Sequence, residues 1–184
     1  MNKDITFYYE WIKEDKKELR ILTMIAEQQG FKGSLADICR YFNRSPQNKT
    51  KNTIKESIEK LSESRFITVK HSGNTWELEI IPQDTEIHVD HSLYMKLITH
   101  DYKEKIAWEA IVKVLMWLTK RGDERHKDRE IAVDINYSED TVGDAKAVLE
   151  NHYKMIDRKV ARRKVGNDWW RNGQYIDVRA WPRE

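Results

Sequence analysis

The amino-acid sequence predicts a mainly α protein of the α+β class, with small β-hairpins and two similar halves. Three segments carry apolar residues at three- and four-residue spacing, a fourth carries them at two-residue spacing, and this order occurs twice. A chain of 184 residues is long enough for two domains of roughly 90 residues each. The sequence therefore predicts a first domain at 1–82, a linker at 83–92 and a second domain at 93–184.

The first half contains three expected helices and a hairpin. The segment KKELRILTMIAEQQG carries one apolar stripe and ends at Gly30. Ser34 is the expected N-cap of a second helix, SLADICRYF, and the third helix is expected at residues 50–63. The stretch FITVKHSGNTWELEII alternates on both sides of a Gly-containing turn, which is typical of a hairpin.

The second half repeats this order. IAWEAIVKVLMWLTKRG predicts a helix closed by Gly122, KDREIAVDI a short helix, and NYSEDTVGDAKAVLENH a turn followed by a third helix. The tail at 155–181 predicts a longer hairpin, or wing, that turns at Asn172 and Gly173. Thr53 and Thr141 fall at matching points of the two halves, which indicates a tandem repeat.

Three helices followed by a hairpin is the element order of a winged helix-turn-helix. The residues REIAVDINYSEDTVGDAKAVLE resemble that family closely, with a short helix, a brief turn and a helix opened by Ser and then Thr-Val. The first half resembles it less closely, because YFNRSPQNKTKNT lengthens the turn. The resemblance implies two winged-helix domains in tandem, as in regulators and replication initiators of bacteria, plasmids and phages, with double-stranded DNA as the partner.

The helix expected at 50–63 has the composition of a DNA-reading helix. Base edges in the major groove are read by Arg, Lys, Asn, Gln, Ser and Thr near the helix start, while further cations hold phosphates. The candidate DNA-binding residues are Arg44, Ser45, Gln47, Asn48, Lys49, Lys51, Asn52 and Lys55. The alternative reading of the same residues is a solvated helix face, with Pro46 in a simple connection.

The wing at 155–181 carries the most basic patch of the chain. Winged helices use this hairpin to contact the phosphate backbone or the minor groove, where Arg recognises a narrow and negative groove. The candidate DNA-binding residues here are Arg158, Lys159, Arg162, Arg163, Lys164 and Arg171. The alternative is that these cations pair with acidic residues of the protein while Trp169 and Trp170 cover a core.

The second expected reading helix, SEDTVGDAKAVLE at 138–150, has the wrong charge for DNA. Its expected solvent-facing residues are four carboxylates and one cation, namely Glu139, Asp140, Asp144, Glu150 and Lys146. Such a surface repels phosphate, although acidic residues at a helix start also stabilise the helix. A winged-helix module that binds a basic protein partner through this helix is therefore a competing hypothesis. Gly143 is expected either to permit close packing of this helix or to be a tolerated surface glycine.

The helix in IAWEAIVKVLMWLTK is apolar on more than one side, so it must be covered on more than one side. Simple core burial is the default expectation, with the other domain or a second copy of the chain in a homodimer as its cover. The aromatic segments FYYEWI and SLYMKLI are interpreted as helices that precede and cover each domain.

Catalytic and metal-binding signals are weak. The chain has 7 glycines and contains neither a phosphate-binding G-x-x-x-x-G-K-[ST] loop nor a G-x-S-x-G elbow. His88, Asp90 and His91, with His100 and Asp101 nearby, are the best metal candidates, but no Cys or His pair elsewhere completes a ligand set. Cys39 lies in an apolar stripe, which favours an inert thiol. We expect no enzyme, no metal and no cofactor.

Composition favours a cytoplasmic protein that does not enter a membrane. The single cysteine fits a reducing compartment, and the longest apolar-rich stretch is interrupted by charges. A net charge of +2 is too small to indicate nucleic acid, so any basic surface must be local. The predicted function is sequence-specific DNA binding by a transcription regulator, through the helix at 50–63 and the wing at 155–181. A plasmid or phage replication initiator is the alternative.

Overall fold

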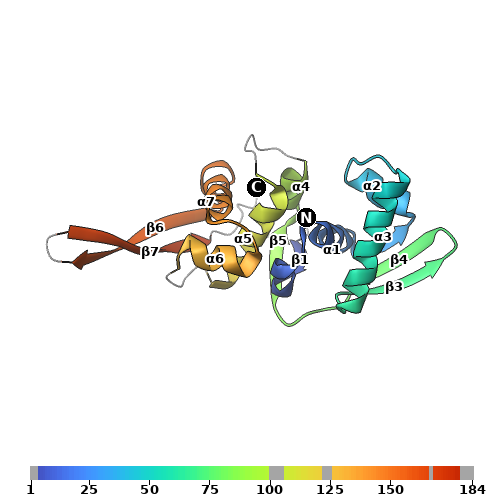
Figure 1. The fold of residues 1–184 in the computed structure, drawn as a ribbon, viewed down its shortest axis with the longest axis horizontal. Helices are drawn as coiled ribbons and strands as arrows, with labels where there is room; N and C mark the ends of the chain where they lie inside the picture. Colours follow the sequence, from blue (N-terminus) through green and yellow to red (C-terminus); the bar gives the residue numbers. More distant parts are fainter. Residues whose placement is uncertain (1–3, 100–105, 122–125, 166–167, 179–184) are drawn as a thin grey trace. The chain divides into compact units, whose positions relative to one another are not determined.

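The computed structural model describes residues 4–99, 106–121, 126–165 and 168–178, with side chains as far as Asp157. Backbone contacts divide the chain into two compact units, Met1–His91 and Ser92–Glu184. Both units combine helices with small antiparallel sheets (Figure 1), so the predicted mainly helical α+β class is confirmed. No helix within the described ranges has the length and apolar character needed to cross a membrane.

The first and last strands of the first unit pair with each other. Strand β1 (Asp4–Tyr8) pairs antiparallel with β5 (Glu86–Asp90). The interpretation of 83–92 as a linker is therefore wrong for β5, whose alternating Ile87 and Val89 are buried. The interpretation of FYYEWI as a helix is wrong in part, because only the short 3₁₀ helix η1 (Tyr9–Lys13) follows β1.

Three helices form the body of the first unit. They are α1 (Lys16–Gln28), α2 (Leu35–Tyr41) and α3 (Asn48–Glu63), and α1 contacts α3, as does α2. Helix α1 ends where Gln29 and Gly30 take positive φ values and the Gly30 N–H donates to the Ile25 carbonyl at 2.9 Å. Helix α3 begins at Asn48, earlier than the predicted start at Thr50.

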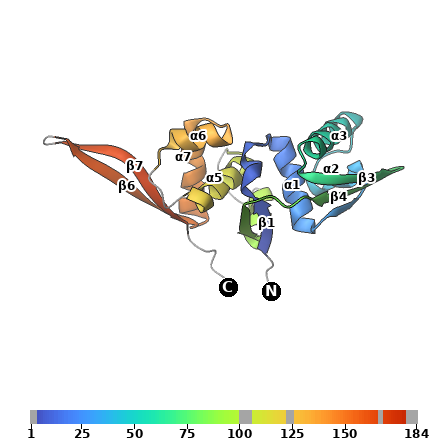
Figure 2. The same ribbon diagram turned by 90° about the horizontal axis from the view of Figure 1, so that it is seen from below.

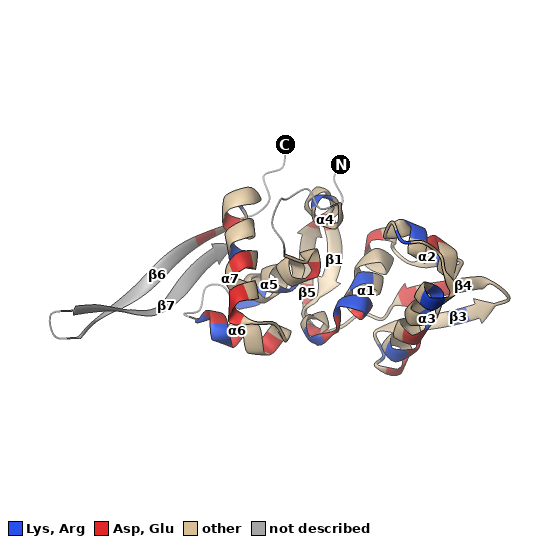
Figure 3. Cartoon of the chain, turned by 45° about the horizontal axis from the view of Figure 1, so that its top comes forward, with Lys and Arg blue, Asp and Glu red and all other residues tan. Residues whose placement is uncertain are grey.

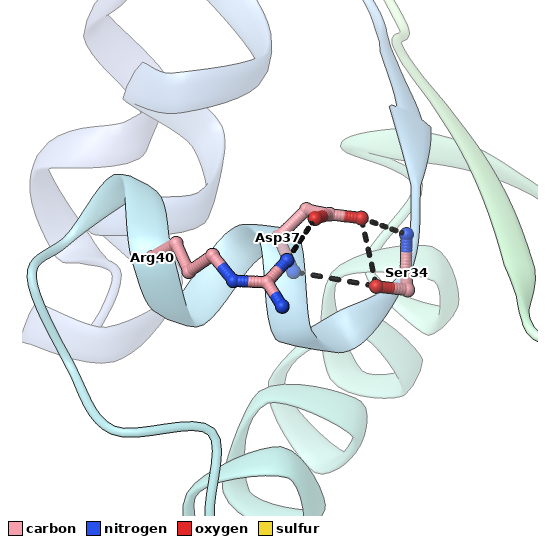
Figure 4. A network of polar contacts seen from close by, with 3 residues as sticks. All are labelled: Ser34, Asp37 and Arg40. Atoms are coloured by element: carbon pink, nitrogen blue, oxygen red, sulfur yellow. Dashed lines mark hydrogen bonds and ion pairs between the residues drawn. The ribbon is translucent and has the colours of Figure 1, made fainter.

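Ser34 caps α2, as predicted. The Asp37 backbone N–H donates to Ser34 Oγ at 3.4 Å, and the Ser34 N–H donates to Asp37 Oδ2 at 2.8 Å (Figure 4). These reciprocal bonds form a capping box. The Ser34 N–H and hydroxyl, aided by Arg40, lower the pKa of the Asp37 carboxyl below its ordinary value.

A three-stranded sheet completes the first unit. The expected hairpin is β3 (Ile67–Ser72) and β4 (Thr75–Ile80), with Gly73 at φ +58° in its turn. Strand β2 (Phe31–Gly33) adds to β4, giving the order β2-β4-β3 (Figure 2). Strand β2 was not predicted, because a three-residue strand is too short to show an alternating pattern.

Helix α4 (His91–Ile98) begins at the unit boundary, and three further helices follow it. They are α5 (Trp108–Arg121), α6 (Asp128–Ile135) and α7 (Glu139–Ala147), and α7 continues into the short π-helix η2 (Val148–His152). Helix α5 packs on α6 and α7, and its residues from Trp108 to Leu118 are buried. Asn136 in the left-handed conformation and the N-cap Ser138 form the brief turn between α6 and α7, as predicted.

The tail forms the hairpin β6 (Ile156–Val165) and β7 (Asp168–Val178). The predicted turn at Asn172 and Gly173 is wrong, because both residues lie inside β7. The register shifts between Val160 and Arg162 of β6, so Asn172 and Gly173 of β7 oppose the single residue Ala161 in a β-bulge. A glycine inside a strand commonly marks such a bulge, and the NG signal therefore had a different structural cause.

Candidate nucleic-acid interface

The N-terminal half of α3 presents a polar and basic outward face. Ser57, Ile58 and Leu61 bury the inner face of this helix. Opposite them, Asn48 and Asn52 follow one another at a spacing of four residues and are exposed, and Lys49 and Lys55 beside them are exposed as well. The first turn of the helix contains only polar and basic residues.

The loop from α2 to α3 continues this face. Asn43 takes a positive φ of 52°, and the Arg44 N–H then donates to the Cys39 carbonyl at 2.8 Å, which ends α2. The predicted residues Arg44, Ser45 and Gln47 are exposed, and Gln47 is the N-cap residue of α3. The structure therefore places all the predicted candidates of the first half on one continuous stretch, with Lys51 half-buried among them.

The charged residues in the C-terminal half of α3 are mostly acidic (Figure 3), namely Glu56, Glu59 and Glu63 against Lys60. Lys55 forms an ion pair with Glu59 at 3.7 Å, which reduces its availability to a phosphate. Lys60 hydrogen-bonds to Asp15 at 3.1 Å, and this bond raises the pKa of the Lys60 ammonium. The accessible cations of the helix therefore gather at its N-terminal half.

Two cations of α1 join this surface and were missed in the sequence analysis. Lys17 and Arg20 lie with Arg44 and Lys49 around a cavity of about 250 Å³ between α1, α2 and α3. Only the packing of α1 against α3 brings them to the candidate surface, so no signal within their own segment could have identified them.

The β3–β4 hairpin of the first unit adds a small exposed group that the sequence analysis also missed. Lys70 and His71 are exposed near the turn at Gly73. The His71 ring lies 4.1 Å from the ring of Trp76, which is buried, so the imidazole is held against the hairpin. The basic residues that precede the turn in KHSGN were the signal for this group.

Helix α7 of the second unit has a more acidic surface than the sequence analysis expected. Lys146 was predicted to face solvent, but it is fully buried and pairs with Asp128 of α6. It lies on the same side of α7 as the buried Val142 and Ala145. The remaining charged side chains of α7, Glu139, Asp140 and Asp144, are exposed carboxylates (Figure 3).

The basic residues predicted for the second unit lie on β6 and β7. Arg162 pairs with Arg171 across the hairpin, and Arg163 and Lys164 pair with Trp170 and Trp169. Arg158 and Lys159 lie nearer the base of the same hairpin. The side chains of all these residues are outside the described part, so their contacts stay a prediction.

The metal candidates of the sequence analysis separate in the structure. His91 Nε2 lies 3.0 Å from Glu27 Oε1, whereas His88 lies near Thr6 and Glu86 on exposed strand positions. His100 and Asp101 are outside the described residues. Among the residues that are described, no group of three or more His, Cys, Asp or Glu side chains could hold a metal ion. Burial raises the pKa of the Cys39 thiol, which disfavours the thiolate.

Neither a protein-family model nor a curated protein or solved structure matches this chain. The surface chemistry of each unit is therefore the basis for a functional proposal.

Proposed function

We propose that this chain binds double-stranded DNA as a tandem winged-helix transcription regulator, with α3 of the first unit in the major groove. The single observation that carries the proposal is the polar and basic face formed by the 44–47 loop and the first half of α3. Asn48, Lys49 and Asn52 are exposed there beside Arg44. Asn reads adenine through paired hydrogen bonds, and Lys reads guanine or holds phosphate.

The helix dipole and the charge distribution of α3 support binding through its N-terminal half. The N-terminus of a helix carries a partial positive charge and unpaired N–H groups, which attract phosphate. Lys17 and Arg20 of α1 add positive charge beside this end, while Glu56, Glu59 and Glu63 lie toward the other end. The helix would therefore enter the groove with its N-terminal half.

The order of elements supports the winged-helix assignment of the first unit. Strand β2 lies between α1 and α2 in the chain, and the hairpin β3–β4 follows α3. The three strands form one sheet of order β2-β4-β3. In this proposal Lys70 and His71 on the hairpin contact the phosphate backbone next to the groove that α3 occupies. The basic β6–β7 hairpin of the second unit is proposed to supply a second backbone or minor-groove contact. A plasmid or phage replication initiator uses the same interactions and is the alternative role.

The second unit favours a different function for its own α7. The buried Lys146 leaves Glu139, Asp140 and Asp144 as an exposed acidic group, which would repel a phosphate backbone. We therefore propose that α7 does not read DNA. A basic protein partner is the second candidate for this helix, and a titration with a Lys/Arg-rich peptide tests it. Binding should weaken when the three carboxylates are changed to amides.

Fluorescence anisotropy with a labelled random-sequence duplex tests the DNA proposal. Binding through cations releases counterions, so the logarithm of the affinity should fall linearly with the logarithm of the salt concentration. A selection from random duplexes should then enrich one motif, because α3 offers base-reading side chains as well as cations. Absence of a complex at low salt would refute the proposal, and binding without any enriched motif would refute base reading by α3.

A further inference from the structure

The cavity between α1, α2 and α3 has a composition that DNA binding does not require. Its lining includes Ile21, Ile38 and Cys39, which are buried, and Phe42 and Ile54, which are half-buried. A phosphate backbone would contact only the cations at the rim. The apolar interior therefore indicates a different occupant.

We propose that this cavity binds a small amphipathic anion, which is a compact apolar molecule with one carboxylate or phosphate group. The volume of about 250 Å³ is slightly below the range of about 300–1,000 Å³ that is typical of pockets for drug-sized ligands. Burial of an apolar body against Ile21, Ile38, Phe42 and Ile54 provides affinity, because it removes apolar surface from water.

The cations that line the cavity favour a ligand with a negative charge. Four cations line the cavity from three elements, namely Lys17 and Arg20 from α1, Arg44 from the 42–47 loop and Lys49 from α3. Hydroxyl groups of Thr50, Thr53 and Ser57 line the α3 side. The Thr53 hydroxyl donates to the Lys49 carbonyl at 3.1 Å, and its oxygen lone pairs can accept from a protonated acid or from water.

The ligand would also affect the proposed DNA surface, and this part of the inference rests on the proposed function. Arg44 and Lys49 belong both to the rim and to the candidate DNA contacts. An anionic head bound between them neutralises charge that would otherwise hold a phosphate. Ligand and duplex should therefore weaken each other's binding by the same factor.

Calorimetric titration of the full chain without DNA tests the cavity separately from DNA binding. Octanoate and octyl phosphate serve as probes, octan-1-ol supplies the same body without charge, and acetate and inorganic phosphate supply the head alone. We expect at least one amphipathic anion to bind at least 10-fold more tightly than octan-1-ol and than its own head group. Equal binding of octanol and the anions, or no binding of either anion at millimolar concentration, would overturn the proposal.

Two variants locate the binding. The double change Lys17→Gln/Arg44→Gln should weaken anion binding about 10-fold and leave octanol binding unchanged, whereas Lys13→Gln/Lys120→Gln removes two exposed cations elsewhere and should change neither. Thr53→Met fills the cavity from the α3 wall and should abolish binding, with circular dichroism confirming the fold. Unchanged anion binding in the Lys17/Arg44 variant would refute the site, whatever the stability of the Thr53 variant.

A competition experiment tests the coupling. The anion that binds should reduce duplex affinity of the unmodified chain, and it should not do so for Thr53→Met, which keeps Arg44 and Lys49. An anion that binds in calorimetry but leaves duplex affinity unchanged refutes the coupling alone, whereas failure of duplex binding in every condition refutes the proposed function and leaves the cavity result intact.

Discussion

The Lys146 ammonium on α7 donates a hydrogen bond to the carboxylate of Asp128 at the start of α6. Lys146 is fully buried, while 28% of the Asp128 side chain is exposed. This ion pair joins the two helices that flank the Asn136–Ser138 turn. It also removes from the surface of α7 its one cation, and the acidic character of that surface follows directly.

Lys146→Met should destabilise the protein by about 3 kcal/mol, because it leaves the Asp128 carboxylate beside a buried apolar group without its cation. Thermal or urea denaturation measures the effect. The double variant Lys146→Met/Asp128→Asn should recover part of the loss, since it removes the unpaired charge. If the double variant loses as much stability as the sum of the two single variants, the two residues do not interact.

Gly143→Ala should stabilise the protein by about 1 kcal/mol, because Gly143 lies inside α7 and alanine favours the helix by that amount. A Cβ atom there would lie 3.9 Å from Asp128 Oδ2, an ordinary van der Waals distance. The contrasting variant is Gly30→Ala. Gly30 has φ +111°, so a Cβ atom is strained there and the melting temperature should fall. A loss of stability in Gly143→Ala would show that α7 needs the glycine for packing.

Asp37→Asn should remove part of the acid sensitivity of the first unit. Hydrogen bonds from Ser34 lower the pKa of Asp37 in the folded state. This contribution to stability is therefore present above the unfolded pKa of about 3.9 and is lost as the pH falls through the lower folded value. We expect Asp37→Asn to lower the melting temperature at pH 7 and to reduce the difference between pH 7 and pH 3. The control is Asp84→Asn in a loop, which should leave that difference unchanged.

The longer helices were predictable from sequence because each shows an apolar periodicity over several turns. Helices α1, α3 and α5 carry apolar stripes that span several turns. Helix α2 is short, but Ser34 is recognisable in the sequence as its N-cap. Strand β2 and the pairing of β1 with β5 were not predictable in this way. Their partners lie far along the chain, at β4 and at the opposite end of the unit, and short strands carry little pattern.

In the candidate site too, residues close together in the sequence were predictable, whereas residues brought there by packing were not. Arg44, Asn48 and Lys49 could be identified from the sequence because they are close together in it. Lys17 and Arg20 could not, because only the packing of α1 against α3 brings them to the same surface. Lys146 was misplaced because its charge suggested solvent, whereas its position on the inner face of α7 and its partner Asp128 permit burial.

The salt dependence of duplex binding by an α3 variant measures whether the N-terminal half of this helix holds the duplex. Affinity should be measured at several salt concentrations for the unmodified chain, for Arg44→Ala/Lys49→Ala/Lys51→Ala and for Lys60→Ala, a cation of the same helix that is held by Asp15. We expect weaker binding by the triple variant, with a log–log salt slope shallower by about 2–3 units, and an unchanged slope for Lys60→Ala. The same affinity and slope for the triple variant and the unmodified chain would contradict DNA binding through α3.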